Sequence, residues 1–595
     1  MSIYRVSGTQ KAQTEIAVQG FRTGQIIQGK ILKLYPENKA QIQLGSQKMI
    51  AQLEASLSVG GKYHFQVQAT GDVIHLRVLG EPLVNQEHSN ATNLMQQLGL
   101  KTSKTNTDFL QTLIGEKIPF DKVQLSRAFQ VLDGVKNKVQ AGTILKEMIT
   151  AKFPITESVY HALVVKHSSS STVQMKSVLQ QLRQDSIKPQ LTDRLSRMVE
   201  PPSNASTALI KQILNEIMTN NRQLFTILKA AGAVDQSVEF SAWKSQWEAV
   251  AKQNNLNLQH ITNQQTSTLK LPHQINANGV IQAFEQMVTN KEALLSGTRE
   301  ITQLWGDKIS RSVAVNSTLS LQEFSQMKQQ VTQLIAPLLS DGQLQITKIV
   351  QNNPVQLRQL LAVIQTLNHM QTYTTIEHTL HTVNTNKGFI QATPRDQFMM
   401  QVNQTLLFTG LSYENQLAKD PEQQQATVKG MLLQLLQHSD GAVNERGQQL
   451  LHFINGMQLS TVNETTNFLQ ASLQVPGERL GLASDLNLEI EGRKTAEGEI
   501  NPDYCRILFY LDLANLKETI IDMNIQKRAV AVTIFNDTDQ LKDLSISIQP
   551  VLKEGLQDLN YQLSTVAFKP IKKSDDPIKA KTAYQPSYKG VDFRI

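Results

Sequence analysis

The spacing of apolar residues changes twice along this chain, and that change most restricts the folds it can adopt. Between Gly24 and Leu79, short β-branched runs alternate with turn residues, whereas beyond residue 92 apolar residues recur every three to four positions. After Pro476 the alternating pattern returns. A period of two indicates strands, and a period near 3.6 indicates amphipathic helices. The sequence therefore predicts an α+β multidomain protein with a small N-terminal β-barrel, a long, mainly helical middle and a C-terminal α+β domain.

The length of the chain, 595 residues, calls for several units, because a single core rarely grows beyond about 250 to 300 residues. Proline-containing and polar stretches supply the boundaries between them. The predicted parts are a flexible leader (1–20), the barrel (21–80), a linker (81–92), three helical regions (93–200, 201–272 and 273–475), the C-terminal domain (478–570) and a basic tail (571–595).

Five short strands are predicted between residues 24 and 79. Turn-forming residues separate them, namely Pro36-Glu37-Asn38, Gly45-Ser46, Gly60-Gly61 and Gly71-Asp72. Five strands in about sixty residues are typical of a small closed barrel of the OB or SH3-like kind. The predicted strands are 25–34, 41–44, 48–53, 63–69 and 73–78.

Helix starts can be identified in the middle of the chain. Asp121 and Thr156 each follow a proline by two residues and precede an apolar run, as helix caps do. Two ordinary helix starts or a duplicated helical unit would both give this pattern. A further helix has one apolar face, which we expect to dock on a helix of the same chain. That face consists of Leu209, Ile210, Ile213, Leu214, Ile217 and Met218.

The C-terminal domain is predicted as four strands, a helix from about Asp539 to Leu559, and a last strand. The strands are 486–490, 506–513, 519–525, 529–535 and 561–568. In the second strand, Ile507 and Phe509 alternate with Leu508 and Tyr510. We expect the helix to cover the Leu508 and Tyr510 face, because these residues cannot be fully solvated.

Residues at the joints of these elements carry a family resemblance. The segments concerned are Leu511-Asp512-Leu513, Ala514-Asn515-Leu516, Ile520-Ile521-Asp522-Met523, Val530-Ala531-Val532-Thr533-Ile534, Leu552 with Leu556, and Tyr561-Gln562-Leu563-Ser564-Thr565-Val566. Together they resemble the C-terminal domain of the flagellar hook-length control family, of Gram-positive type. Lys517 stands where that family usually has a glycine after the leucine of the joint.

The resemblance implies an interaction protein. In that family the C-terminal domain binds the cytoplasmic domain of the flagellar export gate and switches secretion. Carried over to this chain, the partner-binding residues are Leu511, Asp512, Leu513, Leu516, Val530 and Val532. The resemblance also leaves export through a flagellar-type apparatus open, because such substrates need no cleaved signal.

No motif in the sequence indicates catalysis. A Walker loop, a dinucleotide fingerprint, a nucleophile elbow and a paired-histidine zinc helix are all absent. The single cysteine, Cys505, is expected to be a buried small hydrophobe. Glu377, His378 and His381, near His369, are the best metal candidates, but no third ligand is fixed by spacing and solvated helix histidines are the expected explanation. We therefore expect no enzymatic activity, cofactor or metal.

A rival interpretation is a nucleic-acid-associated scaffold. The net charge of +7 is spread along the chain, so it permits this role without indicating it. In the barrel, Lys30, Lys33, Lys39 and Lys48 would supply cations, and Tyr35, Tyr63 and Phe65 would stack on bases unless they form the core. The tail would add Lys569, Lys572, Lys573, Lys579, Lys581, Tyr584, Tyr588 and Phe593, although a solvated basic tail is the simpler explanation of these residues.

The sequence has no segment typical of membrane insertion. The first 20 residues lack the continuous apolar stretch of a secretory signal, and no stretch approaches the roughly 18 apolar residues of a spanning helix. The prediction is a cytoplasmic protein without membrane insertion.

Overall fold

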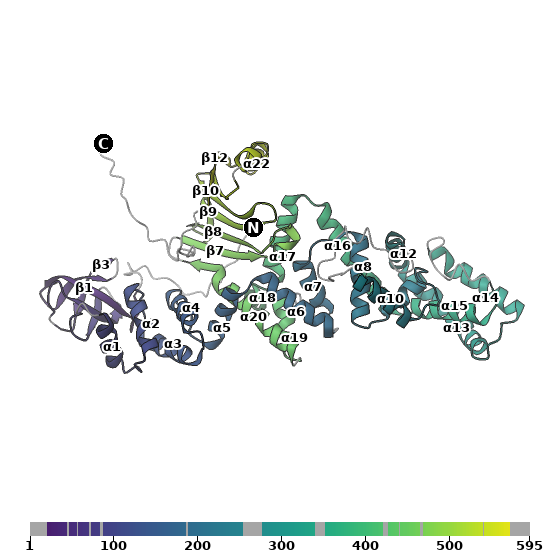
Figure 1. Ribbon diagram of the computed structural model, residues 1–595, viewed down its shortest axis with the longest axis horizontal. Helices are drawn as coiled ribbons and strands as arrows, with labels where there is room; N and C mark the ends of the chain where they lie inside the picture. Colours follow the sequence, from purple (N-terminus) through teal and green to yellow (C-terminus); the bar gives the residue numbers. More distant parts are fainter. Residues whose placement is uncertain are drawn as a thin grey trace. The chain divides into compact units, whose positions relative to one another are not determined.

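The computed structural model describes most of the chain (Figure 1). The described residues are 21–44, 47–55, 57–70, 73–83, 87–185, 189–253, 276–339, 351–419, 427–438, 441–464, 468–538 and 541–571. The predicted leader, the tail beyond residue 571 and the boundary at residue 272 lie outside them. The described residues form two compact units, an N-terminal unit (21–459 with 478–480) and a C-terminal unit (460–477 with 481–571).

The N-terminal unit begins with the predicted barrel. Its strands are β1 (Ile26–Tyr35), β2 (Lys39–Leu44), β3 (Gln47–Leu53), β4 (Lys62–Thr70) and β5 (Ile74–Leu79). They close in the order β1-β2-β3-β5-β4, with β3 and β5 parallel and the other pairs antiparallel. Alternate residues of every strand, among them Ile31, Ile42 and Phe65, fill the interior. The α+β multidomain prediction is confirmed, including the small closed barrel.

Local backbone features close the barrel tightly. Glu37 and Asn38, in the predicted turn between β1 and β2, both have left-handed backbones, with φ of 61° and 55°. A bulge lies between Ile31 and Lys33 in β1. A Cβ atom on Gly29 would lie 2.5 Å from Leu44 Cδ2, so only glycine allows this approach of the core side chains.

The barrel is joined to the first helices through backbone and core contacts. Ile26 N donates to Phe120 O at 2.6 Å, and Phe120 N donates to Ile26 O at 3.3 Å. Ile26 also belongs to the core of the helices that follow. The predicted linker 81–92 is partly wrong, because α1 (Glu87–Gln97) already begins within it and buries Ala91.

Both predicted helix caps are present. The first helices are α1, α2 (Lys104–Gly115), α3 (Lys122–Gly134), α4 (Lys138–Thr150), α5 (Glu157–Ser168), α6 (Ser171–Asp185) and α7 (Pro189–Val199). Asp121 accepts from Gln124 N at 2.8 Å, and Thr156 Oγ1 accepts from Val159 N at 3.3 Å. Each cap satisfies a backbone N–H that has no partner inside its helix.

The predicted apolar helix docks inside the chain as expected. Its face on α8 (Ala205–Met218) is buried in a core with Trp243 and Trp247, except that Met218 is 60% exposed. The same core includes α9 (Gln223–Ala230), α10 (Phe240–Gln253), α12 (Ala277–Thr289), α13 (Lys291–Ala314), α14 (Leu321–Leu334), η2 (Ala336–Leu338), α15 (Pro354–Leu367) and α16 (Met370–Gln391).

Two helical cores each join segments from more than one of the predicted helical regions, and the predicted boundary at residue 272 lies outside the described residues. One core extends from Leu209 to Leu380. Another joins α6 and α7 to residues between Val428 and Ile454, so two distant parts of the sequence pack together. The remaining helices are α17 (Pro394–Phe408), α18 (Tyr413–Lys419), α19 (Val428–Leu436) and α20 (Ala442–Thr461). The three predicted helical regions therefore share cores instead of forming separate ones.

The C-terminal unit is built on a seven-stranded sheet. Its strands are β6 (Val462–Glu464), β7 (Phe468–Val475), β8 (Leu486–Lys494), β9 (Ile500–Leu513), β10 (Lys517–Gln526), β11 (Ala529–Phe535) and β12 (Gln562–Lys569). They lie in the order β12-β11-β10-β9-β8-β7-β6, and only β11 and β12 are parallel. The predicted C-terminal strands are all present.

The sheet begins before residue 478, the predicted start of the domain. Val475 pairs with Leu486, so β7 is an integral strand of the sheet. The Pro476-Gly477 punctuation is an ordered connection rather than a linker. A Cβ on Gly477 would lie 2.1 Å from Ser484 O, which shows how closely the chain packs after β7.

The predicted helix is divided in two, and it covers the other face of the sheet. It forms α21 (Leu541–Ser545) and α22 (Gln549–Asp558), with a proline near the start of α22. Leu552 and Leu556 pack with Ile507 and Val532, and not against Leu508 and Tyr510 as predicted. The Ile507 face is the more continuously apolar of the two across the neighbouring strands, which explains the outcome.

Among the residues that the structure describes, no helix is long and apolar enough to cross a membrane.

Candidate functional site

The outer face of the barrel carries a row of cationic and amide side chains. The strand register pairs Lys62 of β4 with Lys30 of β1, Lys30 with Gln43 of β2, and Gln43 with Lys48 of β3. Directly opposed residues on neighbouring strands have Cβ atoms roughly 4.5 to 5.5 Å apart. The three lysines and the glutamine therefore form one continuous row across four strands.

Two further rows lie on the same face of β1, β2 and β3. Lys33 opposes Gln41, which opposes Ile50, and Tyr35 opposes Lys39, which opposes Gln52. The bulge in β1 keeps Lys33 and Lys30 on the exterior although they are three residues apart. We call this surface the β1–β3 face; it consists of Lys30, Lys33, Tyr35, Lys39, Gln41, Gln43, Lys48, Ile50 and Gln52.

The positive charge of the β1–β3 face is largely uncompensated. Strands β1, β2 and β3 contain no aspartate or glutamate. Within the described part of the chain, Lys30, Lys33 and Lys48 are exposed and form no ion pair. Lys39 is the exception, because its Nζ lies 2.9 Å from Glu37 Oε2 in the turn. Exposed lysines without carboxylate partners are suited to bind phosphates.

The face also offers a ring and apolar surface. Tyr35 is half-buried, and Lys33 Nζ lies 5.3 Å from the centre of its ring. Ile50, on β3, is 52% exposed although it is a large apolar residue. Tyr63 and Phe65 are buried in the barrel core, which is the alternative that the sequence leaves open for them, so they cannot stack on bases. Tyr35 remains as the ring on which a base can stack.

The interior of the barrel is filled, which leaves the outer surface for ligands. His64 lies on β4 and is buried, and burial lowers its pKa to about 4. The imidazole is therefore neutral at physiological pH and adds no charge to the surface. In closed barrels of the OB type, oligonucleotides bind to the face of strands 2 and 3 and to the neighbouring loops. The β1–β3 face includes those two strands.

The residues predicted to bind a partner in the C-terminal unit are not all on its surface. Val530 and Val532 are buried beneath α22, so they are core residues and cannot contact a partner. The other four residues are Leu511, Asp512, Leu513 and Leu516, which are partly exposed around the β9–β10 hairpin. Asn536 Nδ2 donates to Leu516 O at 2.8 Å and fixes the hairpin loop.

Lys517 has the conformation that the family glycine would favour. Its φ is 57°, in the left-handed region, and it pairs with Leu513 at the end of the hairpin. Short hairpin loops often end on a left-handed residue, and glycine adopts this conformation at the least cost. The hairpin therefore ends on a left-handed lysine, at the position where the family usually has a glycine.

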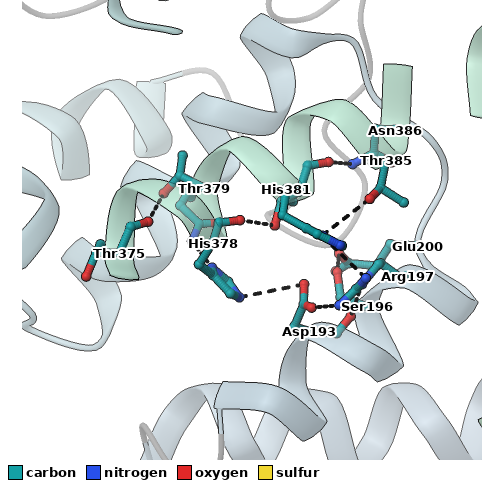
Figure 2. Close-up of polar contacts among 12 residues, drawn as sticks. Asp193, Ser196, Arg197, Glu200, Thr375, His378, Thr379, His381, Thr385 and Asn386 are labelled. Atoms are coloured by element: carbon teal, nitrogen blue, oxygen red, sulfur yellow. Dashed lines mark hydrogen bonds and ion pairs between the residues drawn. The ribbon is translucent and has the colours of Figure 1, made fainter. Parts of the chain in front are cut away.

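The histidines weighed as metal ligands face an arginine instead. His381 Nδ1 lies 3.4 Å from Arg197 Nη1, and His378 Nε2 lies 3.8 Å from Asp193 Oδ1 (Figure 2). Burial and the charge of Arg197 both lower the pKa of His378. The positive charge of Arg197 at this position would repel a metal ion and so disfavours metal binding by the two histidines. Glu377 points elsewhere, with its Oε1 3.1 Å from Lys291 Nζ.

Further metal candidates are lacking in the described residues, where no group of three or more His, Cys, Asp or Glu side chains could hold a metal ion. His369 precedes α16 at its N-cap position. Cys505 is half-buried beside the core under α22, and burial raises the pKa of its thiol. The tail lysines and aromatic residues beyond residue 571 lie outside the described residues, so only Lys569 of that group is placed, in β12.

Two comparisons with known proteins give matches. The family model of the TP0910 S1-like domain matches residues 4–77, which includes all but the end of the five-stranded barrel. Uncharacterized protein YlqG of Bacillus subtilis (strain 168) is 21% identical over 556 residues, which cover 91% of this chain and 88% of that protein. No solved structure matches the chain significantly. The barrel is thus similar in sequence to an S1-like domain.

The sequence alone identified Lys30, Lys33, Lys39, Lys48 and Tyr35, but it did not reveal the row that joins them. Lys62 was missed because its contact with Lys30 depends on closure of the barrel between β4 and β1. The positions of Gln41 and Gln43 can be predicted from the sequence, because they alternate with the buried Ile42 and Leu44 and must therefore face outward. Outward-facing amides beside lysines are candidates for base recognition.

Proposed function

We propose that this chain is a non-enzymatic, cytoplasmic nucleic-acid-binding protein whose β1–β3 face binds single-stranded RNA or DNA. The observation that carries the proposal is the row from Lys62 through Lys30 and Gln43 to Lys48, on a barrel that is S1-like. Lysines of the row attract phosphates, and Tyr35 and Ile50 offer surface to the bases. This favours the nucleic-acid alternative over the export role.

The distribution of charge supports the same location. Residues 21–80 contain seven Lys and Arg against three Asp and Glu, whereas residues 481–571 contain nine against 14. A polyanion is therefore attracted to the barrel and repelled by the C-terminal unit. The C-terminal unit is then free for a different role.

Binding of labelled single-stranded RNA and DNA, followed by fluorescence anisotropy, tests the proposal. In the full chain, the triple variant Lys30→Gln, Lys33→Gln, Lys48→Gln should lose about tenfold or more in affinity at low salt, because it loses phosphate contacts. The matched control is Lys527→Gln, Lys542→Gln, Lys553→Gln, which removes the same charge from exposed sites of the C-terminal unit. Equal losses in both variants would count against a site on the barrel.

We also propose, from the family resemblance, that the C-terminal unit contacts a protein of the export-gate kind. The backbone of Lys517 supports this second proposal, because it reproduces the conformation expected of the family glycine. The matches reported above carry no name that refers to flagella or export. Capture of the export-gate cytoplasmic domain by the full chain tests it, with Leu516→Ala as the variant. Wild-type protein that captures nothing would end this proposal and leave the first intact.

A further inference from the structure

A second cationic cluster lies among the helices of the N-terminal unit. Arg183 of α6 donates from Nη1 and Nη2 to Glu200 Oε1 and Oε2, at 2.6 and 3.1 Å. Lys211 of α8 and Arg479 of η5 (Glu478–Leu480) complete it. We call these four residues, with the Lys176–Glu478 ion pair, the Arg479 cluster. It shares no residue with the barrel.

Arg479 is buried without a full set of hydrogen-bond acceptors. Its side chain stacks on Phe389, with the guanidinium carbon 4.5 Å from the ring centre, and the residue is 4% exposed. Nη1 donates to Glu200 O at 3.4 Å. Nε and Nη2 are buried and have no acceptor among the residues that the structure describes. Burying a charged donor without an acceptor costs free energy, so an acceptor bound at this edge of the guanidinium would stabilise the protein.

The same edge of another arginine in this protein shows what it can bind. In the C-terminal unit, Arg506 Nε and Nη2 donate to the two carboxylate oxygens of Asp522, at 2.8 and 2.7 Å. The Nε–Nη2 edge presents two parallel N–H groups whose spacing fits two oxygens of one carboxylate or phosphate. In Arg479 no carboxylate of the described part of the chain occupies the corresponding edge.

The charges of the cluster also point to a missing anion. Its cations are Lys176, Arg183, Lys211 and Arg479, and its carboxylates are Glu200 and Glu478. Arg197, which pairs with Asp193, adds no net charge. Burial lowers the pKa of Arg479 to about 10 and also lowers the pKa of Lys211. The cluster therefore holds about two more positive than negative charges in a partly dehydrated place.

We propose that the Arg479 cluster binds a doubly charged phosphate-type oxyanion. The Nε–Nη2 edge of Arg479 holds two of its oxygens, and Lys211 supplies the second compensating charge. The Lys176–Glu478 pair is partly exposed, with side-chain exposures of 22% and 24%, so the cluster reaches solvent on that side. The site is independent of nucleic-acid binding by the barrel.

Thermal unfolding of the full chain in inorganic phosphate, against chloride at equal ionic strength, tests the proposal. Phosphate should raise the transition of the N-terminal unit by about 1 to 4 °C, with saturation, because a ligand that binds only the folded state stabilises it. Arg479→Lys should abolish the saturable rise, because lysine lacks the two-pronged edge. The matched control is Arg506→Lys, whose edge is already occupied, and it should keep the rise.

Further variants keep the test decisive. If Arg479→Lys does not fold, Lys211→Gln should weaken phosphate binding at least severalfold in isothermal titration calorimetry. The barrel triple variant should bind phosphate as the wild type does. A nucleoside 5′-monophosphate that acts at lower concentration than phosphate identifies an organic phosphate as the ligand, and a rise with phosphate alone identifies the free anion. No saturable rise in the wild type, or an equal rise in Arg479→Lys, would overturn the proposal and indicate a hydrated edge.

Discussion

The barrel and the C-terminal sheet both expose a polar β-surface, but they treat their cations differently. On the β1–β3 face, Lys30 and Lys33 have no carboxylate partner among the described residues. On the sheet face opposite α22, Arg506 is held by Asp522 and by Glu491, whose Oε1 lies 3.2 Å from Nη1. Cations that already have partners stabilise a sheet, whereas cations without partners remain available for a ligand. The difference supports the proposal that the barrel carries the ligand-binding surface.

The largest expected effect separates the barrel core from its binding face. Phe65 is fully buried, so Phe65→Ala should lower the free energy of unfolding by about 3 to 5 kcal/mol. Tyr35→Ala should change that free energy by less than about 1 kcal/mol yet reduce affinity for single strands by about 1 to 3 kcal/mol. Chemical denaturation and anisotropy together check both values. A Phe65→Ala variant that is stable but fails to bind would show that Phe65 acts in binding and not in the core.

Acid should weaken the barrel through His64. Burial lowers its folded pKa to about 4 from an ordinary 6.5, so its stabilising contribution is complete above pH 6.5 and is lost as the pH falls toward 4. The loss is on the order of 2 to 3 kcal/mol. Glu216 acts oppositely in the same unit, because burial raises its pKa to about 7 and its contribution falls as the pH rises from 4.5.

The difference between the wild type and His64→Leu isolates the histidine from the glutamate. Between pH 7 and pH 4.5, the wild type should lose roughly 2 kcal/mol more than the variant, as measured by urea unfolding at each pH. Parallel pH profiles for the two proteins would mean that His64 is solvated in the folded state.

Removing one carboxylate partner of Arg506 in the C-terminal sheet should lower the free energy of unfolding by a smaller amount. Asp522→Ala leaves Arg506 with Glu491 alone, and we expect a loss of about 1 to 3 kcal/mol in the unfolding of that unit. Lys30→Gln on the barrel, measured in parallel, should stay within about 0.5 kcal/mol of wild type. Similar costs for the two substitutions would erase the contrast between structural and available cations.

A substitution at Lys517 should increase the stability of the C-terminal unit slightly. Lys517 has a φ of 57°, so Lys517→Gly should stabilise the C-terminal unit by about 0.5 to 1 kcal/mol through relief of backbone strain. Lys542→Gly is not a suitable control, because Lys542 lies in a helix. The control is Lys517→Asn: asparagine tolerates the left-handed region and should therefore stabilise the unit by less than glycine does. Destabilisation by glycine would show that the lysine side chain makes a contact worth more than the strain.

Local patterns predicted most of the elements but not their assembly. The turn residues of the barrel and the caps at Asp121 and Thr156 act within a few residues, so the sequence displays them directly. The core that joins Met175 to Ile454 depends on contacts between distant segments, which no local pattern records. The row that includes Lys62 likewise exists only once the barrel has closed.

Two predictions about the C-terminal unit were wrong although the sequence pattern contained evidence against them. In β7, Leu469, Ala471 and Leu473 alternate with polar residues, yet the Pro476-Gly477 pair was interpreted as the boundary of the domain. Val530 and Val532 were placed on a partner surface, although their alternation with Ala531 and Thr533 is the pattern of a strand with one buried face. A resemblance locates an element more reliably than it locates its exposed side chains.

The salt dependence of nucleic-acid binding reports how many phosphates the lysines of the barrel neutralise. For single strands, the slope of log affinity against log salt concentration is about −0.7 for each phosphate that a cation neutralises. The Lys30→Gln, Lys33→Gln, Lys48→Gln variant should therefore have a slope that is shallower by about 2 than that of the wild type. We expect this change together with an unchanged slope in the Lys527→Gln, Lys542→Gln, Lys553→Gln control if the β1–β3 face binds the nucleic acid. Equal slopes for the wild type and the barrel variant, or no binding by the wild type at low salt, would contradict binding at this face.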